Sequence, residues 1–472
     1  MKYISTRGAA PPVSFTQMLL AGLAPDGGLY LPETYPQLSP NAIAGFAGRS
    51  YAEVAQSILT PFVAGEIEAV ALQGMIEAAY ADFRHKSIAP LAQLDSDLFV
   101  LELFHGPTFA FKDLAMQLLA KLIGHVLKAR GERATVIGAT SGDTGAAAIE
   151  AFRDLPQVDL FIVYPHGRVS EVQRRQMTTA EVGNIHVIAL EGTFDDAQAC
   201  VKNMFSHRTL RDELNLCGVN SINLARILFQ TVYYFTSTAV LGGPYRKISF
   251  VVPTGNFGDI LAGWMAKRMG LPIDRLVIAT NSNDILARAL ASGEYIVQTV
   301  HPTQSPSMDI QVSSNFERLL FEAYGRNAGA LCSLMAGLRQ SRGFTIEPGP
   351  LHAIRADFDA FSVTEAETTQ EIARSWRETG ILVDPHTAVG VSAARKAKTC
   401  ACDSPLVVLG TAHPAKFPAA IAQATRMRPE LPGRLAGLFE RKEKFSILPN
   451  DQSEIEHFIR SRAARASKQA AS

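Results

Sequence analysis

The sequence predicts an α/β protein with two regions of parallel β-sheet and a ligand cleft between them. From Leu98 onward, short runs rich in β-branched and aromatic residues alternate with helical patterns, as in DLFVLEL, RATVIGAT and VDLFIVYP. The same alternation returns later in KISFVVPT, DRLVIATN and SPLVVLGT. Strands that alternate with helices are typical of βαβ units, which form parallel sheets. Ligands bind at the carboxyl ends of such strands, so we expect the functional site there.

The length of 472 residues is enough for two or three domains, because one hydrophobic core rarely grows to this size. A Gly- and Pro-rich start and a helical stretch from about Ser50 to Phe83 indicate an N-terminal accessory region over residues 1–92. The alternation of strand-like and helical patterns that follows predicts a smaller α/β domain over 93–240. A larger α/β domain over 241–472 would complete the chain and end in a helical tail.

Charge and cysteine content argue against several classes of protein. Lys and Arg together number 45, as do Asp and Glu, so no overall field favours nucleic acid or an anionic membrane. The five cysteines lack zinc-site spacing and are odd in number, so we expect neither a metal site nor a disulfide framework. No apolar run is long enough to span a bilayer and no signal peptide is visible, which favours the cytoplasm. The oligomeric state stays open, and a monomer is compatible with the sequence.

Two Gly-rich turns stand between a strand and a helix, where they could bind an anion. The first, in RATVIGATSGDTGAAAIEAF, carries Thr140, Ser141, Asp143 and Thr144, and the second runs from Gly255 to Asp259. Free backbone N–H groups and a helix N-terminus bind anions at such turns. Neither turn matches the P-loop or the dinucleotide-binding GxGxxG pattern. One such turn could be an ordinary loop, whereas two in one chain favour one or two phosphate sites.

A third segment, VNSINLARILFQTVYYF, offers a cationic ligand for an anion. Asn220 or Ser221 can cap the helix that this segment predicts, and Arg226 lies about a turn and a half further on. A guanidinium there could bind a phosphate near the start of the helix. An exposed arginine on a solvated helix face is the alternative, and both interpretations stay open.

Lys112 is the candidate nucleophile. In FHGPTFAFKDLAMQLLA it follows Phe109 and Phe111 and opens a predicted helix. Desolvation and the positive end of the helix dipole both lower the pKa of an amine, which leaves it neutral and nucleophilic. A lysine, a hydroxyl-rich turn and a phosphate cradle together indicate pyridoxal phosphate bound as a Schiff base. On the lysine alone, a surface residue that extends its ammonium to water would be the simpler interpretation.

Several motifs, in this order along the chain, resemble those of the threonine synthases, in the longer form found in many bacteria and fungi. The motifs include STRG, PDGGLYLPE, FHGPTFAFKD, GATSGDTG, NSINLARI, PTGNFGD, SPSMDIQVSSNFERLLFE, DPHTAVG and GTAHPAKFP. The resemblance covers nearly the whole chain. It implies a fold type II pyridoxal-phosphate enzyme, with two open twisted α/β domains and the cofactor in the cleft between them.

The resemblance also implies a role for each matching residue. Lys112 would bind the cofactor covalently and carry protons, and the hydroxyl of Thr411 would bond the pyridine nitrogen. Asp143 would lie near the phenolic oxygen, where many relatives carry Asn; a carboxylate there repels a phenolate unless one of them is protonated. The cofactor phosphate would be bound by Gly255, Asn256, Phe257, Gly258 and Asp259. The substrate would be bound by Thr140, Ser141, Thr144, Asn220, Ser221 and Arg226, the last three at its phosphate.

The implied reaction converts O-phosphohomoserine and water into threonine and phosphate. Its two successive proton abstractions favour a mobile base, which a released Lys112 amine could be. Three alternatives remain: a hydroxy-amino-acid dehydratase of the same fold, a catalytically silent homologue, and a nicotinamide-dependent oxidoreductase that the missing GxGxxG disfavours. His386 and His413 are expected to act as structural hydrogen-bonding groups, and SPSMDIQVSSNFERLLFE has no chemistry that its residues reveal.

Overall fold

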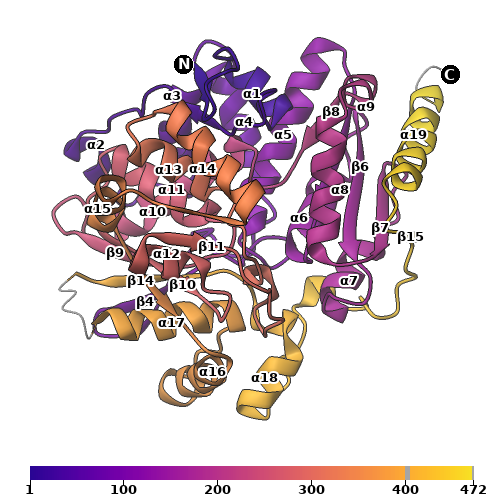
Figure 1. Cartoon of the computed structure of the whole chain (residues 1–472). Helices are drawn as coiled ribbons and strands as arrows, with labels where there is room; N and C mark the ends of the chain where they lie inside the picture. The colour runs from indigo at the N-terminus through magenta and orange to yellow at the C-terminus, as the bar shows by residue number, and fades with distance from the viewer. Residues whose placement is uncertain (399–403, 470–472) are drawn as a thin grey trace.

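The computed structural model describes residues 1–398 and 404–469 (Figure 1). Its framework is two separate sheets, one parallel and one mainly parallel, as the sequence predicts. The larger sheet has six strands, and its only antiparallel pair is the one at the β3 edge. In spatial order its strands are β13 (Phe358–Ser362), β10 (Ile273–Thr280), β9 (Ile248–Pro253), β14 (Leu406–Gly410), β4 (Leu98–Glu102) and β3 (Leu91–Asp95).

The smaller sheet has five strands, all parallel. Strand β6 reads VDLFIVYP and is buried along its whole length, because helices cover both faces of the sheet. Its successive side chains alternate between two hydrophobic cores, as the strand period of two requires. In spatial order the strands are β15 (Ser446–Pro449), β7 (Ile185–Glu191), β6 (Val158–Pro165), β5 (Ala134–Ala139) and β8 (Leu216–Gly218).

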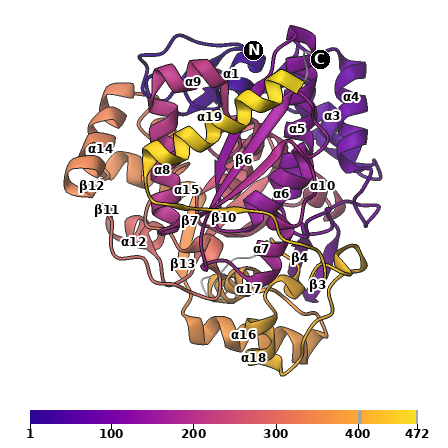
Figure 2. The ribbon, with the colours of Figure 1, turned by 90° about the vertical axis from the view of Figure 1, so that its right-hand side faces the viewer.

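Helices from distant parts of the chain cover the smaller sheet. The C-terminal helix α19 packs on one face beside α8, with Ile455 and Ile459 fully buried against the strands (Figure 2). Helix α6 covers the opposite face and packs on α5. The helices of this half are α5 (Lys112–Arg130), α6 (Asp143–Phe152), α7 (Glu171–Thr178), α8 (Phe194–Ser206), α9 (Arg208–Leu214) and α19 (Gln452–Gln469).

The larger sheet has its own set of helices. Helix α17 packs against strands β9, β10 and β14, and α10 packs on both α11 and α5. The helices are α10 (Leu224–Val240), α11 (Gly258–Arg268), α12 (Ile285–Ser292), α13 (Phe316–Ala323), α14 (Ala328–Ser341), α15 (Pro348–Asp357), α16 (Glu365–Thr379), α17 (Pro385–Lys398) and α18 (Pro418–Thr425). Three short 3₁₀ turns are η1 (Pro306–Met308), η2 (Pro414–Lys416) and η3 (Gly433–Leu435).

The N-terminal region packs on the helices of both halves. The expected helical stretch is a pair, α3 and α4; a capping box between Ser50 and Glu53 starts α3. Helix α3 packs on α10, and α4 packs on α5. The region contains β1 (Tyr3–Ser5), α1 (Phe15–Ala21), β2 (Tyr30–Pro32), α2 (Pro40–Ala44), α3 (Tyr51–Val63) and α4 (Ala69–Tyr80). Strands β1 and β2 pair, and a second small hairpin joins β11 (Glu294–Ile296) to β12 (Gly343–Thr345).

The sheets do not divide the chain at the expected boundaries of 92/93 and 240/241. Strand β3 spans the 92/93 boundary and β4 lies within the expected smaller domain, yet both pair into the larger sheet, where β4 adjoins β14. Strand β15 lies within the expected larger domain, yet it pairs with β7 of the smaller sheet. Each exchange buries a strand edge against a distant partner, so the two halves share chain segments.

Among the described residues, no helix is long and apolar enough to cross a membrane.

Candidate active site

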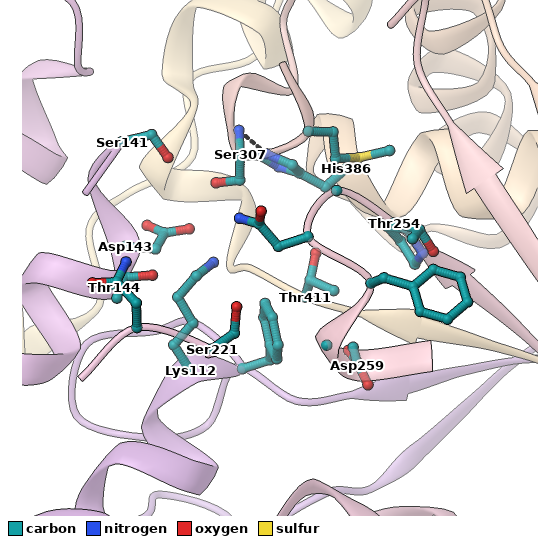
Figure 3. A pocket seen from close by; sticks show the side chains of 18 of the residues that line it. Lys112, Ser141, Asp143, Thr144, Ser221, Thr254, Asp259, Ser307, His386 and Thr411 are labelled. Atoms are coloured by element: carbon teal, nitrogen blue, oxygen red, sulfur yellow. Dashed lines mark hydrogen bonds between the residues drawn. The ribbon is translucent and has the colours of Figure 1, made fainter. Parts of the chain in front are cut away.

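A pocket lies where strands of both sheets end, and all fourteen predicted site residues line it. Strand β5 leads into Thr140, β9 into Thr254 and β14 into Thr411. In Figure 3, Lys112, Asp143 and Thr411 approach the same central space from different parts of the fold. The predicted residues are Lys112, Thr140, Ser141, Asp143, Thr144, Asn220, Ser221, Arg226, Gly255, Asn256, Phe257, Gly258, Asp259 and Thr411.

Lys112 is the first residue of α5 and its amine lies in the pocket. The Nζ atom lies 4.5 Å from the centroid of the Phe111 ring, and Phe111 is held in place by its N–H, which donates to the Thr411 carbonyl at 2.8 Å. Burial lowers the pKa of Lys112 to about 8; Arg226 and Lys416 also lower it, whereas Asp143 and Asp259 oppose them. The neutral amine is therefore far more populated near physiological pH than in an ordinary lysine.

The loop from Gly255 to Asp259 forms the N-terminus of α11. Phe257 adopts a left-handed conformation with φ of 63°, which directs the loop into the helix. A Cβ atom on Gly255 would lie 2.7 Å from the Ser307 carbonyl oxygen, so only glycine fits there. The first N–H groups of a helix have no partner within it. The loop thus presents backbone donors to the pocket, and this cradle fits a phosphate group.

The segment SPSMDIQVSSNFERLLFE, which had no assigned role, holds this loop in place. The Ser313 hydroxyl donates to the Gly255 carbonyl at 2.7 Å. The Asn315 side-chain amide donates to the Asn256 carbonyl at 2.8 Å and to the Ser221 hydroxyl at 3.1 Å. The segment therefore connects the phosphate cradle to the neighbouring turn of the pocket wall.

The start of α10 differs from the prediction for this segment. The cap of α10 is Asn223, whose side chain accepts from the Ala225 N–H at 3.2 Å, so Asn220 and Ser221 are not the cap. Asn220 and Ser221 instead belong to the turn before the helix, which is closed by a hydrogen bond from the Asn223 N–H to the Asn220 carbonyl. Arg226 consequently lies in the first helical turn.

The Arg226 side chain is buried rather than exposed. It has 3% of its surface accessible, and one terminal nitrogen donates to the Val219 carbonyl at 3.0 Å. The Nε atom is buried without a partner among the described residues. Burial lowers the pKa of the guanidinium to about 10, which still leaves it charged at neutral pH. A buried cation with an unused donor at a pocket wall fits an anionic ligand.

Asp143 is charged, and a residue that was not predicted neutralises it. Burial alone would raise the pKa of Asp143, but Lys416 and Lys112 hold it well below its ordinary value. The Lys416 Nζ atom lies 2.7 Å from Asp143 Oδ1, and the Gln173 amide donates to the same oxygen at 2.9 Å. Lys416 lies in the motif GTAHPAKFP, and that motif was the signal in the sequence that could have drawn attention to this lysine. The motif does not reveal that its partner is Asp143, which is distant in the sequence.

Asp259 is buried at the base of the pocket. Its Oδ1 accepts hydrogen bonds from the hydroxyls of Tyr233 and Tyr234, and its Oδ2 has no partner among the described residues. Burial raises the pKa of this carboxyl to about 6, against the tyrosines and Lys112, which lower it. The two tyrosines thus fix Asp259, and through it the first turn of α11, on the face of α10.

The two candidate histidines have structural partners. The His386 Nδ1–H donates to Asp384 at 2.7 Å, and its Nε2 accepts the Ser307 N–H at 3.2 Å, so the ring holds Ser307 in the pocket wall. The His413 side chain caps η2 by accepting from the Ala415 N–H at 3.2 Å. Burial lowers the pKa of His413 to about 4. Both act as hydrogen-bonding groups in this structure.

Comparison with known families identifies the class of protein. Residues 85–411 match the family model described as pyridoxal-phosphate dependent enzyme. Residues 2–80 match the threonine synthase N terminus, and residues 387–459 match the threonine synthase C-terminal model. Two open α/β sheets with a lysine and a phosphate cradle between them define a pyridoxal-phosphate enzyme of fold type II.

Individual relatives narrow this class. A threonine synthase of Pseudomonas aeruginosa is 51% identical over 460 residues, which cover 97% of this chain and 98% of that protein. A crystal structure of pyridoxal-phosphate-bound threonine synthase from Brucella melitensis has a TM-score of 0.93 and 56% identity, and the match covers 98% of this chain and 99% of that one. The yeast enzyme structure has a TM-score of 0.91 and 38% identity, with the same coverage. The chain belongs to the threonine synthase family, which confirms the resemblance, the fold class and the cofactor.

Proposed function

We propose that this chain converts O-phospho-L-homoserine and water into L-threonine and phosphate, and that the predicted residues carry the reaction. The observation that carries the proposal is one pocket that holds a lysine of lowered pKa and two separate places for a phosphate. One is the backbone cradle from Gly255 to Asp259, and the other is Arg226 at the start of α10. A cofactor phosphate and a substrate phosphate would need two such places.

The cofactor would lie between Lys112, the cradle and Thr411. Lys112 would hold it covalently, the cradle would bind its phosphate, and the Thr411 hydroxyl would meet its pyridine nitrogen. When bound, pyridoxal phosphate supplies an electron sink for negative charge that develops on the substrate. A neutral threonine at the ring nitrogen does not enforce a pyridinium, so the protein moderates that electron withdrawal.

Lys112 would serve as the base that moves protons at the α- and β-carbons of the substrate. A base works best when its pKa is close to the operating pH, and burial brings Lys112 to about 8. Its position at the start of α5 keeps the amine beside Asp143 and within the same pocket as Arg226. One amine that reaches both carbons in turn accounts for the two proton abstractions.

Arg226 would bind the phosphate that leaves from the γ-carbon. Its unused Nε donor and its charge stabilise the negative charge that grows on a leaving phosphate. Asn220 and Ser221 would add donors from the turn before α10. Thr140, Ser141 and Thr144 would contact the amino-acid part of the substrate from the turn that follows β5.

The test is a coupled measurement of both products. Purified protein with pyridoxal phosphate should release phosphate and form threonine from O-phosphohomoserine in equal amounts. Lys112→Ala should lose both products and the visible absorbance of the lysine-bound cofactor, because no other pocket residue offers an amine. Phosphate release with a keto acid in place of threonine would instead support a dehydratase. Monomeric state and cytoplasmic location stay predictions, which light scattering and cell fractionation would check.

A further inference from the structure

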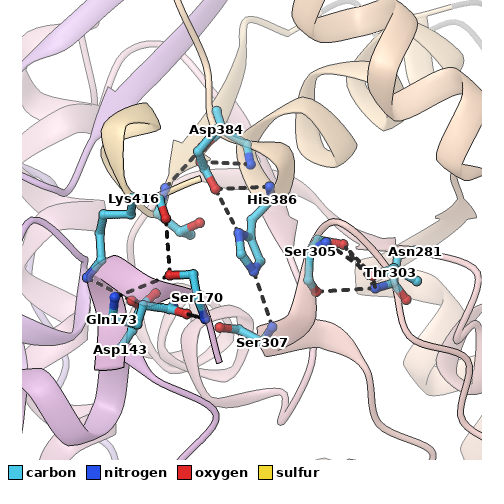
Figure 4. A network of polar contacts seen from close by, with 12 residues as sticks. Asp143, Ser170, Gln173, Asn281, Thr303, Ser305, Ser307, Asp384, His386 and Lys416 are labelled. Carbon is cyan, nitrogen blue, oxygen red and sulfur yellow. Dashed lines mark hydrogen bonds and ion pairs between the residues drawn. The ribbon is translucent and has the colours of Figure 1, made fainter. Parts of the chain in front are cut away.

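Lys416 lies behind the pocket wall and is almost completely buried, with 1% of its surface accessible. It is the last residue of η2, which follows strand β14 of the larger sheet. Its ammonium reaches Asp143 at the start of α6 (Figure 4). It also donates to the Thr108 carbonyl at 2.9 Å. One side chain therefore joins the two halves of the molecule at Asp143, which lines the same pocket as Lys112.

The surroundings of Asp143 hold its carboxylate in one orientation. The Gln173 amide donates to Oδ1, and the Ser170 hydroxyl donates to the Lys416 carbonyl at 3.3 Å. A Cβ atom on Gly142 would lie 2.5 Å from the Gln173 side chain, so the glycine makes room for this contact. Asp143 faces the pocket, whereas Lys416 and Gln173 contact it from outside.

The charges around Lys112 show what Lys416 does. Asp143 lies between two lysines, with Lys416 on the outer side and Lys112 on the pocket side. The other charged groups that act on Lys112 are Arg226 on α10 and Asp259 on α11. If Lys416 were absent, the buried carboxylate would have Lys112 as its one remaining lysine partner. An amine held as a counterion is protonated and cannot act as nucleophile or base.

We propose that Lys416 is a positioning residue for the reaction: it neutralises Asp143 from behind, so that Lys112 stays free for the cofactor and the substrate. The proposal rests on the function proposed above. It also accounts for a buried carboxylate at the wall of this pocket, because Asp143 and Lys416 together carry no net charge. Asp143 on α6 and Lys416 on η2 would thus act together as a neutral ion pair, although they are far apart in the sequence.

The test is a double-mutant cycle on the holoenzyme, read from the pH midpoint of the visible band of the bound cofactor without substrate. Lys416→Met should raise that midpoint by about one pH unit, because an uncompensated carboxylate favours a proton on the nearby nitrogen. Asp143→Asn should lower it, because Lys416 would then repel that proton. The double variant D143N/K416M should return to within about 0.3 units of the wild type and recover most of kcat/KM.

Lys267→Met is the matched control. Lys267 pairs with Asp357 at the same 2.7 Å, at the far end of α11, so its loss removes a partly exposed ion pair of the same length away from the pocket. It should leave the midpoint unchanged. An unchanged midpoint in K416M, or a double variant that shows the sum of the single losses, would overturn the proposal. Since the readout needs no substrate, a wild type inactive on O-phosphohomoserine would refute the proposed function and leave this inference to be judged separately. If K416M does not fold, the pH midpoint of D143N alone tests the proposal: a lower midpoint supports it, and an unchanged midpoint overturns it.

Discussion

At Lys112, burial and neighbouring charges act on one amine in opposite directions. Burial removes water from the ammonium, and the cations of Arg226 and Lys416 repel it further, whereas Asp143 and Asp259 attract it. The net effect is a pKa of about 8, well below that of a lysine in water. The amine is therefore reactive because burial, helped by the cations on α10 and η2, outweighs the attraction of the carboxylates on α6 and α11.

This pKa predicts how the apoprotein takes up its cofactor. Only the neutral amine attacks the cofactor aldehyde, so the rate of incorporation should rise with pH and level off above a midpoint near 8. Stopped-flow absorbance after mixing apoprotein with pyridoxal phosphate would measure it. A midpoint near 10.5, the ordinary value for lysine, would show that burial does not act on this amine.

Arg226 allows a second prediction for a single residue. Arg226→Ala should lower kcat/KM for O-phosphohomoserine by about 10²-fold or more, because loss of one charge-assisted donor at a developing anion has that effect. Binding of pyridoxal phosphate should change little, since the cradle from Gly255 to Asp259 supplies its phosphate site. Titration of the visible band gives the cofactor affinity, and phosphate release gives the turnover. Equal losses in both measurements would mean that the two phosphate sites are assigned the wrong way round.

At the scale of elements, the pattern of apolar residues made the strands predictable. The order of the strands in each sheet was not predictable, because it depends on pairing between distant segments. Strands such as β6 and β9 are buried on both faces and read as continuous apolar runs. The placement of β4 beside β14 depends on a partner about three hundred residues away, which local pattern cannot encode. The cap of α10 was misassigned because Asn220, Ser221 and Asn223 are all good capping residues.

The same limit explains which site residues could be predicted. Lys112 and the Gly-rich turns carry their signal within a few neighbouring residues, so sequence patterns and family motifs identified them. Lys416 acts through its contact with Asp143, and the buried Arg318 of α13 acts through a hydrogen bond to the Tyr30 carbonyl. Both partners are far away in the chain. Their charge and burial become meaningful only once the fold has brought those segments together.

The cradle before α11 gives a prediction about an element. Gly255→Ala would place a methyl group 2.7 Å from a backbone oxygen of Ser307, so the loop must move. We expect the affinity for pyridoxal phosphate to fall by roughly tenfold or more, in line with the 1–3 kcal/mol typical of overpacking. Gly74→Ala is the control, since its Cβ meets nothing within 4 Å, and helix propensity should make that variant slightly more stable. An unchanged affinity in G255A would show that the cradle tolerates displacement.

At the scale of the whole molecule, one buried arginine connects the accessory region to the pocket. Arg318 on α13 is fully buried, and its Nε donates to the Tyr30 carbonyl in β2 at 2.8 Å. A terminal nitrogen donates to the Ile222 carbonyl at 2.6 Å, and the other terminal nitrogen bonds the Asn315 side chain. The N-terminal region, the turn before α10 and the phosphate cradle therefore share one hydrogen-bonding centre.

This connection predicts that stability and substrate binding change together. Arg318→Met fills much of the same volume but removes the arginine donor from three backbone carbonyls, those of Tyr30, Ser221 and Ile222. We expect a loss of about 2–4 kcal/mol in the free energy of unfolding. Because the turn that carries Ser221 also loses its support, kcat/KM for O-phosphohomoserine should fall in parallel. Denaturant titration and phosphate release would measure the two effects.

Arg339→Met tests whether the position of the arginine matters. Arg339 is an exposed arginine on the neighbouring α14, and its replacement should change both measurements little. If R318M loses stability and keeps full turnover, the accessory region supports the fold alone. A parallel loss in R318M, with R339M unaffected, is the expected result. It would mean that the N-terminal region helps to fix the geometry of the active site, because its Tyr30 carbonyl and the Ile222 carbonyl of the substrate turn share Arg318 as a donor.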